Sequence, residues 1–243
     1  MSSTHDGRRH AILAIDTATA QAVIASGSPD GRTDGITTWA AGYRHGETLL
    51  STIGRFLGEQ NIRRSRLTGI VVGTGPGAFT GLRVGIATAK GLAHGLRLPI
   101  VGVSTAEALL AALADVEGEE TGDGTSRSEP GAASVLLLPA GPADRLLVRP
   151  GARPELLPGG RDPDLAPGQR LVAVDLDGRA SADALDRGER ARTRLGQALI
   201  RIGAERLRSG AADDLAELVP EYVTLPRGVT SQTGEVAWSH DRR

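Results

Sequence analysis

The stretch GTGPGAFTGLRVGIATAKG, residues 73–91, decides the fold because a strand, a turn and a helix meet within it. It contains six glycines and one proline, and the apolar run GIVVGTG at 69–75 leads into it as a buried strand. A glycine-rich turn between a strand and a helix directs backbone N–H groups and the helix dipole toward an anion. The stretch therefore predicts either a phosphate-binding loop or a tight turn that only orients the helix expected at 80–96.

The turn lacks the residues that complete two common phosphate-binding motifs. A Walker loop ends in Gly-Lys-Ser or Gly-Lys-Thr, whereas Lys90 lies fifteen residues after Gly75 in this chain. The glycines at Gly73, Gly75 and Gly77 also fail to continue into the third glycine of the dinucleotide-binding motif. The residues alone favour a tight turn, with Thr80 as the N-cap of the helix.

Upstream of this turn, three short runs predict an antiparallel β-meander. AILAI at 11–15 ends at Asp16, QAVIAS follows at 21–26, and GITTWAAG at 35–42 supplies the third strand. A carboxylate at the end of the first strand either caps a turn or faces the metal and phosphates of a bound nucleotide. The candidate nucleotide region consists of Asp16, Thr17, Gly73, Gly75 and Gly77.

Two helices flank the strand that leads into the turn. RHGETLLSTIGRFLGEQ carries an amphipathic stripe that predicts a helix at 45–59. In the helix after the turn, Gly81, Gly85 and Ala89 share one face, although an interior glycine costs about 1 kcal/mol relative to alanine. Such small residues serve either close packing within the chain or contact with another subunit, and the sequence leaves both open. With a further strand at 98–103, the order of elements predicts an α/β fold with a mixed sheet.

Composition excludes several classes of function. The chain has 243 residues, a formal net charge of −1 and no cysteine, so disulfides, thiolate nucleophiles and zinc–sulfur sites are excluded. The near-zero charge makes the chain a poor lone binder of nucleic acid or of an anionic membrane. Its five histidines include no i, i+4 pair that would form a ready metal site. No apolar run is long enough for a signal peptide or a membrane span, so we expect a cytoplasmic protein without a membrane partner.

A serine hydrolase is an alternative suggested by GVSTAEALL at 102–110, which resembles a nucleophile elbow around Ser104. The only histidine downstream is His240, in the C-terminal tail. Ser104 and Glu107 also have the spacing of a capping box, in which each side chain satisfies a free amide at the helix start. Capping is the favoured interpretation.

A composition change divides the chain. DVEGEETGDGTSRSEPGAAS at 115–134 is polar, acidic and rich in glycine and serine, which is typical of a flexible linker. The runs SVLLLP and RLLVRP after it predict a hairpin. The predicted division is a flexible N-terminus at 1–9, an N-terminal lobe at 10–113, an acidic linker at 114–133, a C-terminal lobe at 134–227 and a disordered tail at 228–243.

Three segments together resemble a known family: ILAIDTATAQAVIAS, RHGETLL and VVGTGPGAFTGLRVGIATAKGLAHGLRLPIVGVSTAEAL. They are similar to the bacterial tRNA threonylcarbamoyladenosine biosynthesis protein family TsaB, also called YeaZ or glycoprotease M22-like, over residues 11–113. VPEYV at 219–223 resembles the closing segment of that family, whereas 136–149 departs from it. The resemblance implies an actin-like or sugar-kinase-like duplicated fold (ASKHA, ribonuclease H-like), with two lobes that each carry a five-stranded mixed sheet.

The resemblance also implies a function. In that family the chain is a non-catalytic subunit required for N6-threonylcarbamoyladenosine (t6A) in ANN-decoding tRNAs; it binds the transferase TsaD, is joined by the ATPase TsaE, and reaches tRNA only through the complex. It carries no cofactor of its own, ATP and a metal ion are expected on the partner subunits, and a homodimer forms where TsaD is absent. The metal-binding histidines of the catalytic paralogue TsaD fall on Thr105 and Leu109 here, so no metal and no metalloprotease chemistry are expected.

The expected partner interface lies on the two helices at 45–59 and 80–96. The alternative to a non-catalytic subunit is an enzyme: an active ATPase or small-molecule kinase of the same fold, which would use Asp16 and the turn Gly73–Gly77. The interface residues expected from the resemblance are Leu49, Ile53, Phe56, Leu82, Gly85, Ala89 and Leu92.

Overall fold

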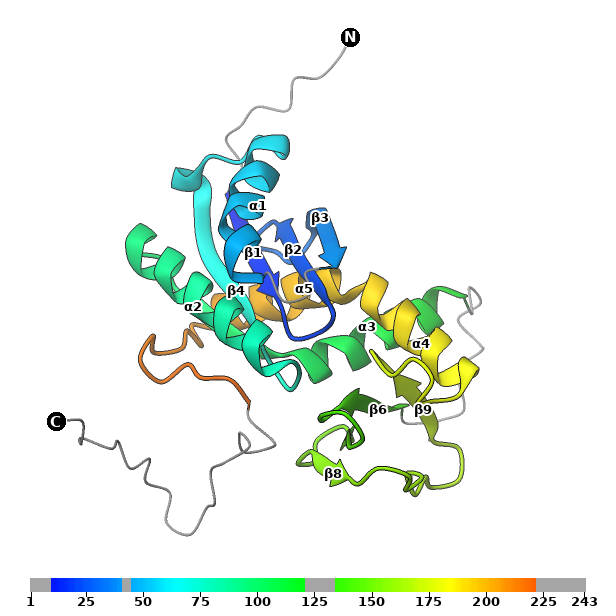
Figure 1. Cartoon of the computed structure of the whole chain (residues 1–243). Coiled ribbons are helices and arrows are strands. Elements are labelled where there is room, and N and C mark those ends of the chain that lie inside the picture. Colours follow the sequence, from blue (N-terminus) through cyan, green and yellow to red (C-terminus); the bar gives the residue numbers. More distant parts are fainter. Residues whose placement is uncertain (1–9, 41–44, 121–133, 222–243) are drawn as a thin grey trace, which may run out of the picture.

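The computed structural model describes residues 10–40, 45–120 and 134–221, whose elements form two α/β lobes (Figure 1). Each lobe is built on a mixed β-sheet, which confirms the predicted fold class. The predicted extension at 1–9, the tail at 228–243 and residues 121–133 of the predicted linker lie outside the described residues.

The first sheet has five strands in the order β3-β2-β1-β4-β5. β2 is antiparallel to both β1 and β3, whereas β4 runs parallel to β1 and to β5, so the carboxyl ends of β1, β4 and β5 meet at one edge. Side chains alternate between two core clusters, with Ile12 and Ala14 on one face and Leu13 and Ile15 on the other. The strands are β1 (Ala11–Asp16), β2 (Gln21–Gly27), β3 (Thr33–Ala40), β4 (Leu67–Gly75) and β5 (Ile100–Ser104).

Helices cover both faces of this sheet. α1 (His45–Glu59) and α2 (Phe79–Leu96) pack on the face of Leu13, whereas α3 (Thr105–Glu120) and α5 (Leu195–Arg208) pack on the opposite face. The helices predicted at 45–59 and 80–96 are therefore confirmed. Thr80 is not an N-cap, because α2 begins at Phe79 and no side chain caps it.

The second sheet, in the order β8-β7-β6-β9, repeats the strand directions of β3-β2-β1-β4. The predicted hairpin is β6 and β7, and α4 (Ala182–Thr193) packs against β9. The five strands expected from the family are not reached, because the described residues of this lobe form four. The strands are β6 (Ser134–Pro139), β7 (Arg145–Val148), β8 (Glu155–Leu157) and β9 (Arg170–Ala173).

Two predicted boundaries need correction. α3 continues to Glu120, so residues 114–120, which the sequence placed in the linker, are helical. α5 lies within the predicted C-terminal lobe, but it returns to the first sheet, where a Cβ atom on Gly203 would overlap Val71 of β4. This glycine lets the helix backbone approach the sheet closely, a long-range contact that local sequence patterns do not report.

Candidate functional site

Asp16, the carboxylate predicted to face a nucleotide, ends β1 and is fully buried. Its Oδ2 accepts a hydrogen bond of 2.7 Å from the Thr105 hydroxyl at the start of α3, and its Oδ1 accepts one of 2.8 Å from the Ala18 amide. Thr105 Oγ1 accepts in turn from the Gly75 amide at 3.1 Å. Asp16 therefore joins the ends of β1, β4 and α3 through groups of the chain itself.

The ionisation of Asp16 is shifted by its surroundings. Burial raises the pKa of Asp16 from 3.8 to about 6, because an ionised carboxylate loses its hydration in the core. The hydrogen bonds from Thr105 and Ala18 act against this rise by favouring the ionised form, and the nearby charge of Asp175 adds to it. Asp16 consequently changes charge closer to neutrality than an ordinary aspartate does.

The glycine turn is closed against the connection between β1 and β2. The Ala78 amide donates a hydrogen bond of 2.7 Å to the Ala18 carbonyl, and a Cβ atom on Gly77 would overlap that carbonyl. A Cβ atom on Gly73 would overlap the Asp16 carboxylate, and Gly75 has a φ of +106°, which favours glycine. Close packing within the chain therefore accounts for Gly73 and Gly77, and backbone conformation accounts for Gly75.

The C-terminal segment covers the same turn from the other side. The Glu221 carboxylate accepts hydrogen bonds from the hydroxyls of Thr74, at 2.5 Å, and Ser104, at 3.2 Å, while its amide donates to the Thr74 carbonyl at 2.8 Å. The predicted capping box is wrong, because Ser104 bonds outward to this segment and Glu107 pairs with Arg206 at 2.7 Å. Ser104 therefore has a structural partner that is a carboxylate, not a histidine.

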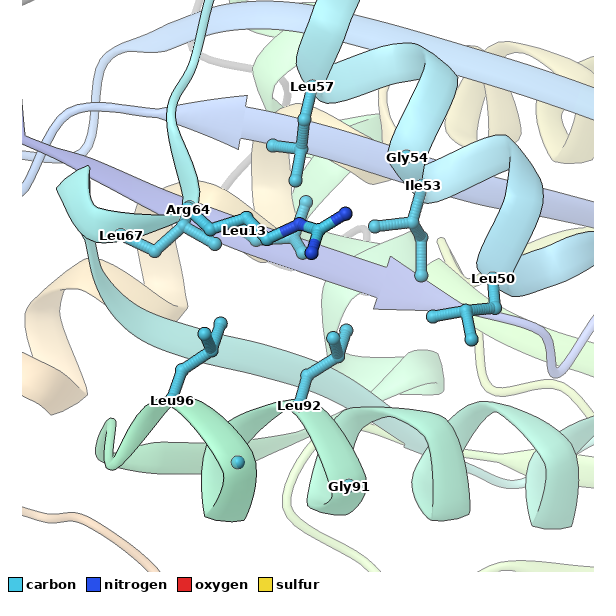
Figure 2. A pocket seen from close by; sticks show the side chains of 11 residues that line it. Leu13, Leu50, Ile53, Gly54, Leu57, Arg64, Leu67, Gly91, Leu92 and Leu96 are labelled. Carbon is cyan, nitrogen blue, oxygen red and sulfur yellow. The ribbon is translucent and has the colours of Figure 1, made fainter.

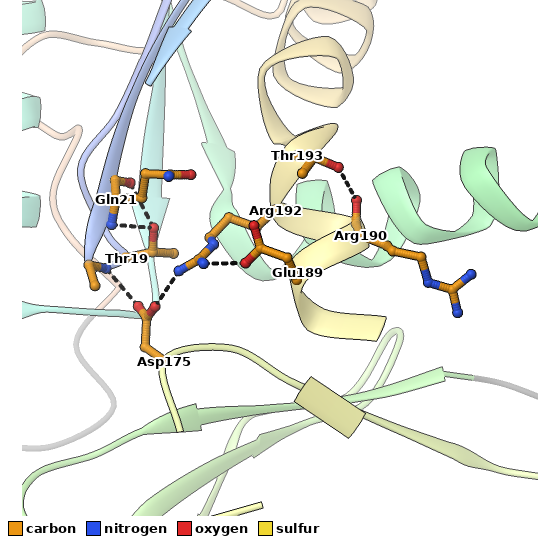
Figure 3. Close-up of polar contacts among 8 residues, drawn as sticks. Thr19, Gln21, Asp175, Glu189, Arg190, Arg192 and Thr193 are labelled. Atoms are coloured by element: carbon orange, nitrogen blue, oxygen red, sulfur yellow. Dashed lines mark hydrogen bonds and ion pairs between the residues drawn. The ribbon is translucent and has the colours of Figure 1, made fainter. Parts of the chain in front are cut away.

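A third carboxylate reaches this edge from the second lobe (Figure 3). Asp175, in the turn after β9, accepts a hydrogen bond of 2.6 Å from the Ala20 amide and pairs with Arg192 of α4 at 2.9 Å. Arg192 also pairs with Glu189 one turn earlier on α4. Because Ala20 follows β1, Asp175 links the two lobes beside the candidate nucleotide region.

Three of the chain's own carboxylates, those of Asp16, Asp175 and Glu221, thus hold amides and hydroxyls around this region. A phosphate placed here would meet their negative charges at short range, where repulsion is strong. Thr17 is also engaged, since its hydroxyl donates to the Gly81 carbonyl at 2.7 Å. The geometry suits a locked junction better than an open anion site.

Thr105 and Leu109, the positions where the resemblance places the metal ligands of the paralogue, are both buried. Thr105 is held between Asp16 and the Gly75 amide, and Leu109, on α3, points into the apolar core that α3 shares with the first sheet and α5. Among the residues that the structure describes, no three His, Cys, Asp or Glu side chains gather where they could hold a metal ion. Nor is any helix in that part of the chain long and apolar enough to cross a membrane.

Most residues predicted for the partner interface lie in the core of this chain. Leu49, Ile53, Phe56, Leu82 and Ala89 are at most 2% exposed, so they offer a partner almost no surface of their own. Gly85 is also buried, and a Cβ atom there would overlap the Thr17 hydroxyl, so its small size serves packing within the chain. The amphipathic stripe was read correctly, but it faces the protein's own sheet.

The surface beside these residues is an apolar groove between α1 and α2, with a volume of about 370 Å³ (Figure 2). Ile53 and Leu92, two of the predicted interface residues, line it. Leu50 at its rim is 61% exposed, and a Cβ atom on Gly54 or Gly91 would meet nothing within 4 Å. The remaining lining residues are Leu13, Leu57, Arg64, Leu67, Gly95 and Leu96.

Sequence reasoning missed three features of this site. No motif in the sequence singles out Asp175, and Glu221 lies only in a segment that resembles the end of the family. Arg64, in the short 3₁₀ helix η1 (Arg64–Arg66), had no motif around it at all. The amphipathic stripe predicted for α1 included Leu50, which is the member of that stripe that the structure leaves exposed, and Gly54 lies beside it.

Comparison with known proteins finds similarity to proteins of tRNA threonylcarbamoyladenosine synthesis, with a family model that matches most of the first lobe. The family model described as TsaD, tRNA N6-adenosine threonylcarbamoyltransferase, matches residues 20–121. The chain is 37% identical to the tRNA threonylcarbamoyladenosine biosynthesis protein TsaB of Escherichia coli over 94 residues, which cover 39% of this chain and 40% of that protein. This chain resembles TsaB. It is also 39% identical over 79 residues to a tRNA N6-adenosine threonylcarbamoyltransferase of Geotalea daltonii, covering 32% of this chain and 23% of that protein.

A third relative, an uncharacterised protein of Mycobacterium leprae, is 38% identical over 101 residues, which cover 40% of this chain and 28% of its own length. The chain thus spans less than half the length of these curated relatives. The fold likeness is wider: YeaZ from Pseudomonas aeruginosa superposes with a TM-score of 0.64 at 20% identity, covering 88% of this chain and all of that one. The YeaZ fold therefore extends over both lobes, whereas the family model matches residues 20–121 alone.

Proposed function

We propose that this chain is the non-catalytic subunit required for t6A modification of ANN-decoding tRNAs, where it binds and supports a TsaD-type transferase. The similarity of the first lobe to TsaB supports the pathway. The observation that carries the non-catalytic role is the locked edge of the first sheet. There the carboxylates of Asp16, Asp175 and Glu221 accept hydrogen bonds from the amides and hydroxyls of the turn region, and these donors are then not available to a nucleotide.

The groove between α1 and α2 is the docking surface for the TsaD-type partner in this proposal. Its apolar lining and the exposed Leu50 leave apolar area that no residue of the described part of the chain covers, and such area suits a protein partner. Gly54 and Gly91 support the same assignment, because open space above each means that packing within the chain does not require a glycine there. Two adjacent helices with such a groove suit helix-in-groove recognition.

In this arrangement the partner subunits, and not this chain, carry out the chemistry. ATP and the metal ion belong to the TsaD and TsaE partners, and this chain contributes no cofactor of its own. It reaches tRNA only through the complex. In the absence of the TsaD-type partner, the same groove is the surface through which two copies of this chain pair.

Reconstitution tests the proposed function. The TsaD-type and TsaE-type proteins and the threonylcarbamoyl-adenylate synthase of the same organism are combined with tRNA, with and without this chain. We expect t6A to form only when the chain is present, and undiminished t6A in its absence would refute the proposal. Titration of the isolated chain with Mg-ATP separates the alternative, because binding with turnover would indicate an ATPase or kinase.

A further inference from the structure

One end of the apolar groove carries a positive charge. Arg64 lies in η1, directly after α1, and Figure 2 shows its side chain running along the groove over Leu13, with the guanidinium directed toward Ile53. Arg64 is the charged residue among the groove's lining residues, on a chain whose net charge is −1. No hydrogen bond or ion pair of Arg64 is found among residues 10–40, 45–120 and 134–221.

The carboxylates nearest in sequence do not neutralise this charge. Glu59, at the end of α1, is directed to Arg55 at 3.7 Å on the exposed surface of that helix. A guanidinium beside apolar side chains loses part of its hydration when a partner covers the groove. An occupant without a counter-charge would therefore leave a cation buried and unpaired, which is costly, whereas a carboxylate would form a charge-assisted and often bidentate pair.

We infer that the groove takes an apolar helix of the TsaD-type partner that carries an aspartate or glutamate opposite Arg64. This inference rests on the proposed function, since it names the chemistry of the segment that docks there. Apolar residues of that helix fill the space between Leu50 and Leu92, and the carboxylate fixes its direction and register at the η1 end. Arg64 is then the residue that determines specificity, while the leucines supply the buried area.

The test measures the Kd between the full chain and the TsaD-type protein of the same organism by titration calorimetry. Arg64→Glu is expected to weaken binding at least about tenfold at low salt, because it replaces an attraction with a repulsion. High salt should narrow that difference by screening. Arg55→Glu is the matched control, since it makes the same charge change on the same side of the fold but outside the groove, and it should leave Kd nearly unchanged.

Charge reversal on the partner identifies the carboxylate. Acidic residues on the partner's surface helices are changed to arginine one at a time, and one of them should restore the affinity of Arg64→Glu. Normal binding by Arg64→Glu, or failure of every reversal to rescue it, overturns the inference. If Leu50→Arg abolishes binding in that case, the docking surface of the proposed function still stands; if Leu50→Arg also binds normally, that surface is wrong as well.

Discussion

The two ends of α2 differ in what surrounds their small residues. Near its start, Gly85 packs so closely on Thr17 that no side chain fits, whereas near its end Gly91 and Gly95 face open space. The first arrangement locks the edge of the sheet where a nucleotide would be expected. The second leaves a groove that the chain does not fill itself. A single run of small residues therefore serves internal packing at one end and, in our proposal, a partner at the other.

The largest expected effect is the difference in the free energy of unfolding between alanine substitutions at a packed glycine and at an open one. Gly73→Ala pushes a Cβ atom into the buried Asp16 carboxylate and toward the Thr105 hydroxyl, and should lower the free energy of unfolding by about 3 kcal/mol or more. Gly91→Ala meets no neighbour and should raise it by about 0.5–1 kcal/mol. Urea unfolding of both variants measures this contrast, and equal effects would mean that the two ends do not differ.

The locked edge should also make stability depend on pH. The folded-state pKa of Asp16 is raised to about 6 above its usual 3.8, so the folded chain holds this proton more tightly than the unfolded chain. As pH rises from about 4 to above 6, Asp16 should therefore reduce the free energy of unfolding by about 3 kcal/mol. Asp16→Asn should remove this decline. The measurement is the free energy of unfolding of the wild type and of Asp16→Asn between pH 4 and 7. If the difference between the two proteins stays constant over that range, the buried environment assigned to Asp16 is wrong.

A side chain added inside the groove tests whether the open end of α2 and the facing part of α1 bind the partner. Gly54→Leu adds a side chain inside the groove, whereas Gly58→Leu adds one at an equally open position of the same helix that does not line it. Both variants should fold, because glycine is a poor helix former. Only Gly54→Leu should weaken binding to the TsaD-type partner, by about tenfold. Equal weakening by Gly58→Leu would show that the groove is not what the partner recognises.

The sequence predicts the features of the fold that depend on residues close together in the chain, but not those that depend on contacts between distant residues. Continuous apolar runs predicted β1 and β4, and period-3.6 patterning predicted α1, because burial is encoded locally in each segment. The same patterns marked Leu49 and Phe56 as apolar but not which molecule covers them, and an amphipathic helix usually buries that stripe in its own core. The surface available to a partner lies at Leu50, the exposed member of that stripe, and at the neighbouring Gly54.

The roles of Asp175 and Glu221 could not be predicted from local sequence patterns, because both bind residues that are distant in the sequence. Asp175 meets the Ala20 amide across 155 positions of sequence, and Glu221 meets Thr74 across 147. Such pairs depend on how two lobes and a terminal segment come together, and no spacing rule reports them. Asp16 was found because a carboxylate at the end of a strand is conspicuous, yet its partners Thr105 and Ala18 show that it ties the fold together.

The smallest effect should come from the outermost of the three carboxylates. Glu221→Gln keeps the shape of the side chain and weakens two hydrogen bonds to Thr74 and Ser104 at an exposed position, so it should lower the free energy of unfolding by less than about 1 kcal/mol. Thermal unfolding against the wild type measures it. A loss as large as that of Gly73→Ala would mean that the C-terminal segment, not the packed turn, holds this edge together.

One t6A assay tests the central claim, that this chain acts through its open groove and not through nucleotide chemistry at its locked edge. In the reconstituted system at about pH 7.5, where Asp16 is mostly ionised, wild-type chain is replaced by Asp16→Asn or by Leu50→Arg, with Leu156→Arg as the control for an exposed leucine of the second lobe. We expect t6A formation at the wild-type rate with Asp16→Asn and Leu156→Arg, and none above background with Leu50→Arg. Loss of t6A with folded Asp16→Asn, together with full activity of Leu50→Arg, would contradict the claim.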